Sequence, residues 1–145
     1  MSDFVERLQE ILADHNLTYQ ELAKQSGVPR QVLYGWIKYK IPPKPKSIIR
    51  LAQFFQCPVD FFIGRTEETK IKFSDNPIPF CDRLRQLIAE KKITPYRACM
   101  QLHIETDIMS VWLNKGTLPN FENLLMLTDY FGCSADYLLG LSDFK

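Results

Sequence analysis

The sequence lacks the features of a membrane or secreted protein. No apolar run approaches the roughly twenty residues that a membrane-spanning helix needs. The N-terminus, Met-Ser-Asp-Phe-Val-Glu, has no basic segment followed by an apolar one, as a signal peptide would have. Cys57, Cys81, Cys99 and Cys133 show no Cys-x-x-Cys spacing, so we expect reduced, buried thiols rather than a disulfide or zinc framework. These absences predict a cytoplasmic protein with no membrane partner.

The sequence also lacks the patterns on which enzymes depend. It has no phosphate-binding loop, no cluster of metal ligands and no nucleophile with a base placed beside it. Cys99 and His103 stand four residues apart and could be drawn as a metal pair. We favour a turn role for His103, because histidine tolerates left-handed backbone geometry better than most residues. We therefore predict no catalytic residue, no metal site and no cofactor.

The chain does contain enough apolar material for packed cores. Its 145 residues, 46% of them hydrophobic, can form one ordinary domain or two very small ones. Apolar residues recur at helical spacing, as in Phe4, Leu8, Ile11 and Leu12, and no convincing pair of strands is present. The pattern predicts an all-α protein.

The stretch from Leu17 to Trp36 predicts two short helices joined by a tight turn. Thr18 is suited to cap the first helix, and Glu21 completes a capping box with it. Gly27 can adopt the left-handed geometry that reverses the chain. Pro29 suits the first turn of the second helix. Two helices joined in this way form a helix-turn-helix.

The second helix of this stretch has one apolar and one polar face. Val32, Leu33 and Trp36 recur at three- and four-residue spacing, so we expect them to face the core. The outward-facing residues are then Arg30, Gln31, Tyr34, Gly35 and Lys38.

These residues resemble the DNA-binding domain of phage repressor and Cro proteins, the XRE family. The resemblance extends from Phe4 to Gly64, and includes Leu17-Thr18, Glu21-Leu22-Ala23, Gly27-Val28, Trp36, Pro43, Leu51-Ala52 and Val59-Asp60. In such proteins the second helix of the motif reads bases in the major groove of double-stranded DNA. The resemblance therefore implies a sequence-specific transcriptional regulator that binds an operator, and a repressor in particular.

The resemblance also assigns DNA contacts along the second helix. Arg30 and Gln31 match the base-reading positions, where Arg can bond guanine and Gln can bond adenine through two hydrogen bonds. Tyr34 and Lys38 would lie nearer the DNA backbone. Gly35 would leave room for close approach.

Other contacts are expected on either side of that helix. Lys40, Lys44 and Lys46, in the following loop, would bind phosphates regardless of sequence. Tyr19 stands where the family usually has glutamine at the start of the first helix of the motif, and Gln20 is the substitute for that contact.

The sequence repeats itself at an offset of 76 residues without a slip in register. The identical pairs include Phe4 and Phe80, Arg7 and Arg83, Leu8 and Leu84, Thr18 and Thr94, Trp36 and Trp112, Pro43 and Pro119, Leu51 and Leu127, Cys57 and Cys133, and Gly64 and Gly140. A complete second set of helix-forming residues predicts a second domain of the same kind. We therefore predict two tandem five-helix helix-turn-helix domains, residues 1–64 and 80–145.

Helix signals recur in both copies. The fourth helix of each is expected to bury Ile48, Leu51, Ala52 and Phe55, or Leu124, Leu127 and Phe131. In the second copy Asn120 and Ser134 are suited to N-cap helices, and Gly140 to end one in left-handed geometry.

Residues 65–79 are predicted to form a linker. They are polar, contain two prolines and lack helical periodicity. Ile71 and Phe73 alternate with lysines, which leaves open a short extended segment that packs on a domain or a partner. Fully extended, the segment would reach roughly 50 Å, so it restricts the placement of the copies little.

The two copies differ in charge, although the whole chain carries only +1. The span from Leu22 to Val59 has no acidic residue and a charge of +7, from Lys24, Arg30, Lys38, Lys40, Lys44, Lys46 and Arg50. The equivalent span from Ala98 to Ala135 has a charge of −3, from Lys115 against Glu105, Asp107, Glu122 and Asp129. A basic surface gains affinity for DNA by releasing counterions, and an acidic one repels it. The first copy is therefore predicted to bind DNA.

The second copy is predicted to serve association, most simply as a homodimer. Glu105 and Asp107 stand at the front of its recognition helix, Val111 replaces Gly35, and Met100 replaces Lys24. An acidic and partly apolar surface suits protein contact better than DNA. Two alternatives stay open: the copies of one chain read adjacent half-sites, or the protein is an interaction adaptor or antirepressor that keeps the fold without binding DNA.

Overall fold

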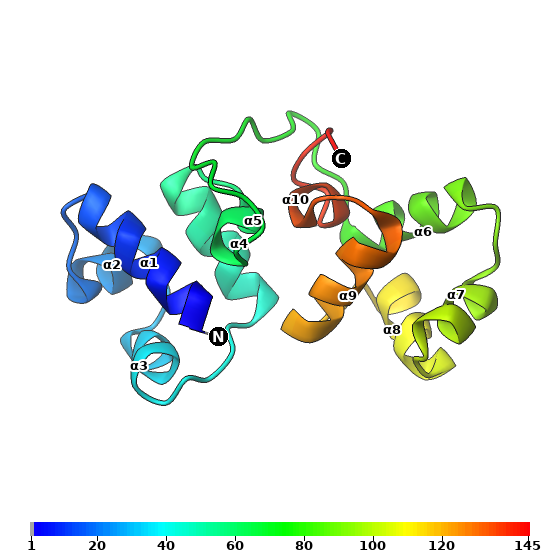
Figure 1. Cartoon of the computed structure of the whole chain (residues 1–145), viewed down its shortest axis with the longest axis horizontal. Helices are drawn as coiled ribbons and strands as arrows, with labels where there is room; N and C mark the ends of the chain where they lie inside the picture. The colour runs from blue at the N-terminus through cyan, green and yellow to red at the C-terminus, as the bar shows by residue number, and fades with distance from the viewer. Residues whose placement is uncertain (1) are drawn as a thin grey trace. The chain divides into compact units, whose positions relative to one another are not determined.

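The chain folds into helices that form two compact units. The computed structural model describes residues 2–145, with side chains from Phe4 onward, and these residues contain helices and no strand. One unit ends at Ile71, and the other spans Lys72–Lys145 (Figure 1). We call them the N-terminal unit and the C-terminal unit. The all-α prediction is confirmed.

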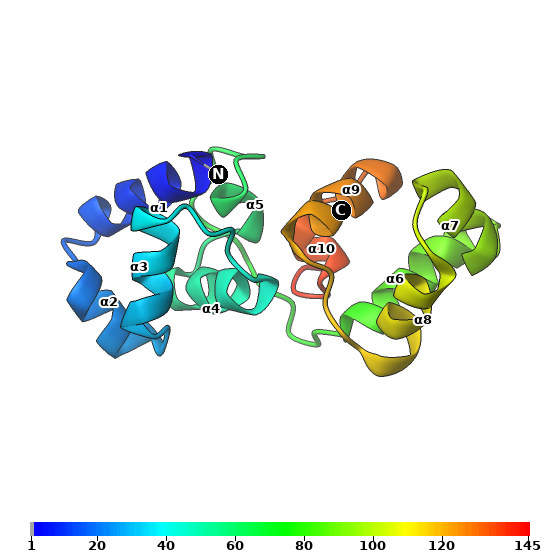
Figure 2. The ribbon, with the colours of Figure 1, turned by 90° about the horizontal axis from the view of Figure 1, so that it is seen from below.

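From Ser2 onward, the N-terminal unit buries its core between five helices: α1 (Ser2–Asp14), α2 (Tyr19–Ser26), α3 (Arg30–Lys38), α4 (Pro45–Phe55) and α5 (Val59–Phe62). Helix α2 packs on α3 and α4, and α5 packs on α1 and α4 (Figure 2). At the centre, the ring of Phe4 meets Trp36 edge to face at 5.2 Å and lies 6.1 Å from Phe62. All three rings are buried, as the helical spacing predicts for Phe4 and Trp36.

Local signals place α2 and α3. Thr18 accepts a hydrogen bond from the backbone N–H of Glu21, and the Glu21 carboxylate accepts one from the N–H of Thr18, so the capping box is formed. Gly27 ends α2 with φ of 80°. Pro29 lies one residue before the helix that it was expected to begin, because α3 starts at Arg30 and Pro29 is its N-cap.

The C-terminal unit also has five helices among its residues: α6 (Phe80–Glu90), α7 (Pro95–Leu102), α8 (Thr106–Lys115), α9 (Phe121–Phe131) and α10 (Ala135–Leu138). Helix α6 packs on α8 and α10, α7 packs on α8, and α9 packs on α10. Trp112 is buried against Phe80, with ring centroids 6.3 Å apart. The bounds of α7, α9 and α10 follow those of α2, α4 and α5 at the 76-residue offset of the sequence.

Most helix ends in the C-terminal unit are as predicted. Asn120 caps α9 by accepting from the N–H of Asn123 at 2.8 Å, and Ser134 caps α10 by accepting from Tyr137 at 3.0 Å. Gly140 has φ of 78°.

Phe131 is only half-buried, where full burial was expected. Its counterpart Phe55 is covered by His15 and Phe62, at ring separations of 5.0 and 6.4 Å. The equivalent positions in the C-terminal unit hold Lys91 and Leu138. Neither can supply a ring to cover Phe131.

Residues 65–79, predicted to be a linker, contact one unit or the other at several points. In the N-terminal unit Arg7 donates to the carbonyl of Thr66 at 3.2 Å and pairs with the carboxylate of Glu67 at 2.7 Å. In the C-terminal unit Ser74 donates through its N–H to the carbonyl of Leu141 at 2.7 Å. The free tether is therefore shorter than its composition indicated. None of the helices in the described part of the chain is long and apolar enough to cross a membrane.

Candidate nucleic-acid interface

One side of α3 presents polar and basic side chains to solvent. Arg30, Gln31, Tyr34 and Lys38 are all exposed, and we call these four residues the reading face. Arg30, Tyr34 and Lys38 follow one another at four-residue spacing, so they form a row along the helix. The Arg30 guanidinium lies 5.7 Å from the centroid of the Tyr34 ring. This distance is within the range of a cation–π contact, which favours this placement of the guanidinium over the ring.

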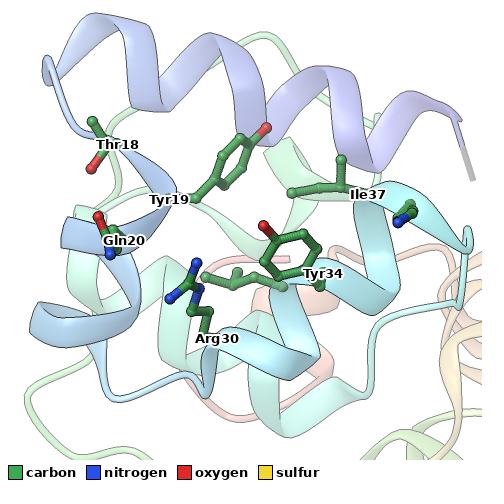
Figure 3. Close-up of a pocket in the computed structure, with 8 residues that line it drawn as sticks. Thr18, Tyr19, Gln20, Arg30, Tyr34 and Ile37 are labelled. Carbon is green, nitrogen blue, oxygen red and sulfur yellow. The ribbon is translucent and has the colours of Figure 1, made fainter.

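A hollow separates the reading face from the start of α2. It has a volume of about 530 Å³ and is lined by Thr18, Tyr19, Gln20, Arg30, Leu33, Tyr34, Ile37 and Lys38. Figure 3 shows the side chains of Tyr19 from α2 and Tyr34 from α3 converging on it.

Tyr19 is half-buried in this hollow, and its hydroxyl is buried with no hydrogen-bond partner among the described residues. Its side chain therefore lies within the wall of the hollow rather than projecting as a freely exposed group. Gln20 is exposed at the same end of α2. The accessible amide is thus that of Gln20, one residue after the position where the family usually has glutamine.

Gly35 is buried, whereas the helical pattern placed it on the outward face. The loop after α3 turns back over it: the N–H groups of Tyr39 and Ile41 both donate to the Gly35 carbonyl, at 3.2 and 3.0 Å. Lys40 makes this turn with φ of 54°. A Cβ on Gly35 would meet Cδ1 of Ile41 at 3.2 Å. The space left by the missing side chain is used by the protein's own loop, which corrects the expectation that it admits DNA.

Basic side chains follow the reading face along the chain. Lys40, Lys44 and Lys46 are exposed on the loop and at the start of α4, where Lys44 is the N-cap. Arg50 has another role, because it donates to the carbonyl of Gly27 at 3.1 Å and so ties α4 to the turn between α2 and α3. The span from Leu22 to Val59 has no acidic residue to offset these charges.

The corresponding surface of the C-terminal unit has a different chemistry. Glu105 and Asp107 are exposed at the start of α8. Tyr96 and Met100, one turn apart on α7, are 64% and 57% exposed. Val111, expected on the outward face, is half-buried instead, because it flanks the buried Trp112. Arg85 donates to the Leu113 carbonyl at 3.1 Å and to Oδ1 of Asn114 at 2.9 Å. These two hydrogen bonds place the Arg85 side chain at the C-terminal end of α8.

His103 ends α7 in left-handed geometry with φ of 57°, as the sequence predicts for a turn residue. Cys99 is buried, and this burial raises the pKa of its thiol and disfavours the thiolate that would bind a metal. In the described part of the chain, no group of three or more His, Cys, Asp and Glu side chains is arranged to hold a metal ion.

Comparison with known proteins places this motif in a family. A family model described as helix-turn-helix matches residues 8–62. An uncharacterised HTH-type transcriptional regulator of Methanocaldococcus jannaschii is 38% identical over 63 residues, which are 43% of this chain and 96% of that protein. The chain belongs to the XRE-type helix-turn-helix family of DNA-binding transcriptional regulators.

Two further members have similar sequences. An uncharacterised HTH-type regulator of Archaeoglobus fulgidus is 36% identical over 63 residues, which are 43% of this chain and 89% of the relative. The uncharacterised HTH-type regulator YobD of Bacillus subtilis is 30% identical over 66 residues, which are 45% of this chain and 58% of the relative. No solved structure matches the chain significantly.

Sequence reasoning missed several side chains of this surface. Ile41 and Tyr39 are exposed beside α3, and Ile37 lines the hollow next to Tyr34. In the sequence, Tyr39 and Ile41 alternate with Lys38 and Lys40, which indicates that their side chains are exposed beside basic ones. This alternation does not reveal that the loop folds back on the helix.

Proposed function

We propose that this protein is a sequence-specific transcriptional repressor that inserts α3 of the N-terminal unit into the major groove of its operator. The observation that carries the proposal is the exposure of Arg30 and Gln31 at the front of α3, within a span of +7 charge that has no acid. Exposed polar groups at the start of the recognition helix can reach base edges, and the surrounding cations favour phosphates.

Arg30 and Gln31 are assigned to base reading. Arg30 can donate two hydrogen bonds to O6 and N7 of guanine, and Gln31 can form a paired contact with N6 and N7 of adenine. Each such contact discriminates by about 1–3 kcal/mol against a wrong base. The contact of Arg30 with Tyr34 supports this role, because a restrained side chain loses less entropy on binding.

The remaining basic residues are assigned to phosphates. Lys38 ends α3, Lys40 lies in the loop, and Lys44 and Lys46 begin α4. Gln20 can add an amide contact from the start of α2. These contacts fix the orientation of α3 in the groove without reading sequence.

The C-terminal unit is assigned to association between two chains. Its exposed Tyr96 and Met100 form a small apolar surface, and Glu105 and Asp107 would oppose phosphates. The 76-residue offset that relates α7, α9 and α10 to α2, α4 and α5 supports descent of both units from one helix-turn-helix domain. The two units would thus share a fold and differ in partner.

A protein-interaction adaptor or antirepressor is the second candidate. The apolar surface at Tyr96 and Met100 favours it. An adaptor of this kind would gain nothing from the basic span around α3, which makes repressor activity the better supported function.

Binding to duplex DNA over a range of salt concentrations tests the proposal. If about four to six cations meet phosphates, the logarithm of the affinity should fall against that of salt concentration with a slope of about −3.6 to −5.4. Single-stranded DNA of the same sequence is the control. A flat salt response, or equal affinity for all duplex sequences, would contradict sequence-specific binding.

A further inference from the structure

The burial of Gly35 changes which side chain stands on the outer side of α3. Gln31 and Gly35 are one helical turn apart, so they belong to the same side of the helix. Gly35 has no side chain, and Ile41 lies over it with Cδ1 at 3.2 Å from the position of a Cβ. The side chain of Ile41 therefore lies next to Gln31, where a side chain at position 35 of α3 would otherwise lie.

The position of Ile41 is fixed by its backbone. Its N–H donates to the Gly35 carbonyl at 3.0 Å, and the neighbouring Tyr39 N–H donates to the same oxygen at 3.2 Å. Gln31, Gly35, Ile41 and Lys44 contribute to one hollow of about 320 Å³ beside α3. Gln31, assigned to base reading, Lys44, assigned to phosphate, and the apolar side chain of Ile41 thus line the same hollow.

Ile41 is not a core residue, because 54% of its surface is exposed. Its hydrocarbon side chain cannot bond a base edge or a phosphate. The major-groove edge of DNA carries one apolar group, the C5-methyl of thymine, and cytosine carries the same group when it is methylated. Contact with this methyl group is therefore the apolar contact that suits an exposed isoleucine next to Gln31.

We propose that Ile41 is a specificity-determining residue that contacts the methyl group of a 5-methylpyrimidine in the operator. The inference rests on the proposed function, in which α3 enters the major groove. Gln31 would bond adenine while Ile41 packs on a methyl group of the same or the adjacent base pair. The pair of side chains then selects adenine together with a 5-methylpyrimidine at that end of the site, although only one of them forms hydrogen bonds.

The test removes or adds the methyl group and nothing else. The preferred duplex is first obtained by enrichment from random sequence with the full chain at fixed salt. Each thymine in it is then replaced by deoxyuridine, and each cytosine by 5-methylcytosine, one position at a time. Burying one methyl-sized group is worth about 0.8 kcal/mol, which corresponds to a change of about fourfold in affinity.

The expected result is a loss of about fourfold at one deoxyuridine position if the methyl group belongs to thymine. If the enriched site has cytosine there, methylation is expected to strengthen binding by about the same factor. The two substitutions thus distinguish the two sources of the methyl group.

Variants of the loop assign the effect to Ile41. With Ile41→Ala the ratio between the thymine and deoxyuridine duplexes should approach one, while Ile41→Val should keep most of it. Tyr39→Ala, a change of an exposed residue in the same loop, is the matched control and should leave the ratio unchanged. A purely structural role for Ile41 would lower affinity for both duplexes equally.

The outcomes separate the two proposals. If no duplex is enriched, the proposed sequence-specific binding is wrong, and the role of Ile41 is overturned with it. If a duplex is enriched but no position responds to either substitution, or if Ile41→Ala keeps the full methyl response, the function stands and the role of Ile41 is overturned.

Discussion

Side chains of the reading face and side chains around it should respond differently to mutation. Arg30→Ala or Gln31→Ala is expected to relax base preference at one or two positions of the operator, with a loss of about 1–3 kcal/mol for the preferred base. Lys44→Ala should instead weaken binding to all duplexes about equally and make the salt slope less steep by about one. Competition binding against a panel of single-base operator variants measures both effects. Equal losses on every duplex for Arg30→Ala would remove it from base reading.

Two glycines of the C-terminal unit provide a matched test of packing. Gly140 has φ of 78°, and a Cβ there would lie 1.8 Å from the Ile78 carbonyl oxygen, whereas Gly132 has φ of 63° with no atom within 4 Å. Gly132→Ala should lower the free energy of unfolding by about 1–2 kcal/mol, through left-handed backbone strain alone. Gly140→Ala adds overpacking to this strain and should lower the free energy of unfolding by about 2–5 kcal/mol. Urea titration followed by NMR signals of the C-terminal unit measures both losses.

The comparison also tests where the predicted linker ends. The N–H of Ile78 donates to the Gly140 carbonyl at 3.3 Å, and the Ile78 carbonyl lies where a Cβ on Gly140 would collide with it. Equal losses for the two glycine variants would mean that residues around Ile78 do not pack on the C-terminal unit in solution.

Among residues, those with local causes could be predicted from sequence. Left-handed geometry at Gly27 and His103 follows from what each residue tolerates next to a helix end. The burial of Gly35 has a distant cause, because Ile41 covers it from beyond the end of α3. Helical periodicity reports which side of a helix a residue is on, and it cannot report whether a loop returns to cover that side.

At the scale of elements, the capping box of α2 should contribute measurably to stability. Thr18→Ala removes the acceptor for the Glu21 N–H and is expected to lower the free energy of unfolding of the N-terminal unit by about 1 kcal/mol. The same substitution also removes the hydrogen bond that the Thr18 hydroxyl donates to the Glu21 carboxylate at 3.0 Å. Thr94 caps α7 in the same way, but Arg97 stands where Glu21 would be and cannot accept a bond from the Thr94 hydroxyl. Thr94→Ala should therefore cost the C-terminal unit less. Urea titrations of both variants measure the difference, and a larger loss for Thr94→Ala would contradict this account.

The helices themselves were predictable because each has its own start and stop signals. Thr18, Asn120 and Ser134 all cap the helices that the sequence assigns to them. The segment between the units was less predictable. Its polar composition is typical of a tether, yet Arg7 holds Thr66 and Glu67 through contacts across a long sequence separation. Composition alone does not reveal such partners.

At the scale of the whole molecule, the two units should fold independently. Each has its own buried tryptophan, Trp36 or Trp112, packed on a phenylalanine of its own first helix. Chains ending at Ile71 or beginning at Lys72 are expected to keep their helical circular dichroism and cooperative unfolding. A chain ending at Gly64 is the comparison, and it should be less stable because it lacks the partners of Arg7. Loss of helical signal in both fragments would indicate a shared core.

The last prediction concerns how the proposed regulator reaches useful affinity. A single small reader seldom binds tightly enough alone, and a two-fold dimer would place two copies of Arg30 on half-sites about 34 Å apart, one turn of DNA. The proposed contact is at Tyr96 and Met100, where the N-terminal unit has Gln20 and Lys24. Replacing both with those residues, Tyr96→Gln with Met100→Lys, removes the apolar surface while keeping side chains that the fold accepts at the equivalent positions.

Sedimentation of the full chain at tens of micromolar should show a dimer, and the double variant should be a monomer. The variant should lose affinity for a duplex with two half-sites and keep its affinity for one half-site, because α3 is unchanged. Gln20→Ala, on the N-terminal unit, is the control for association and should leave the dimer intact. A monomeric full chain whose DNA crosslinks map to residues 105–111 would instead favour the alternative in which both units of one chain read adjacent half-sites.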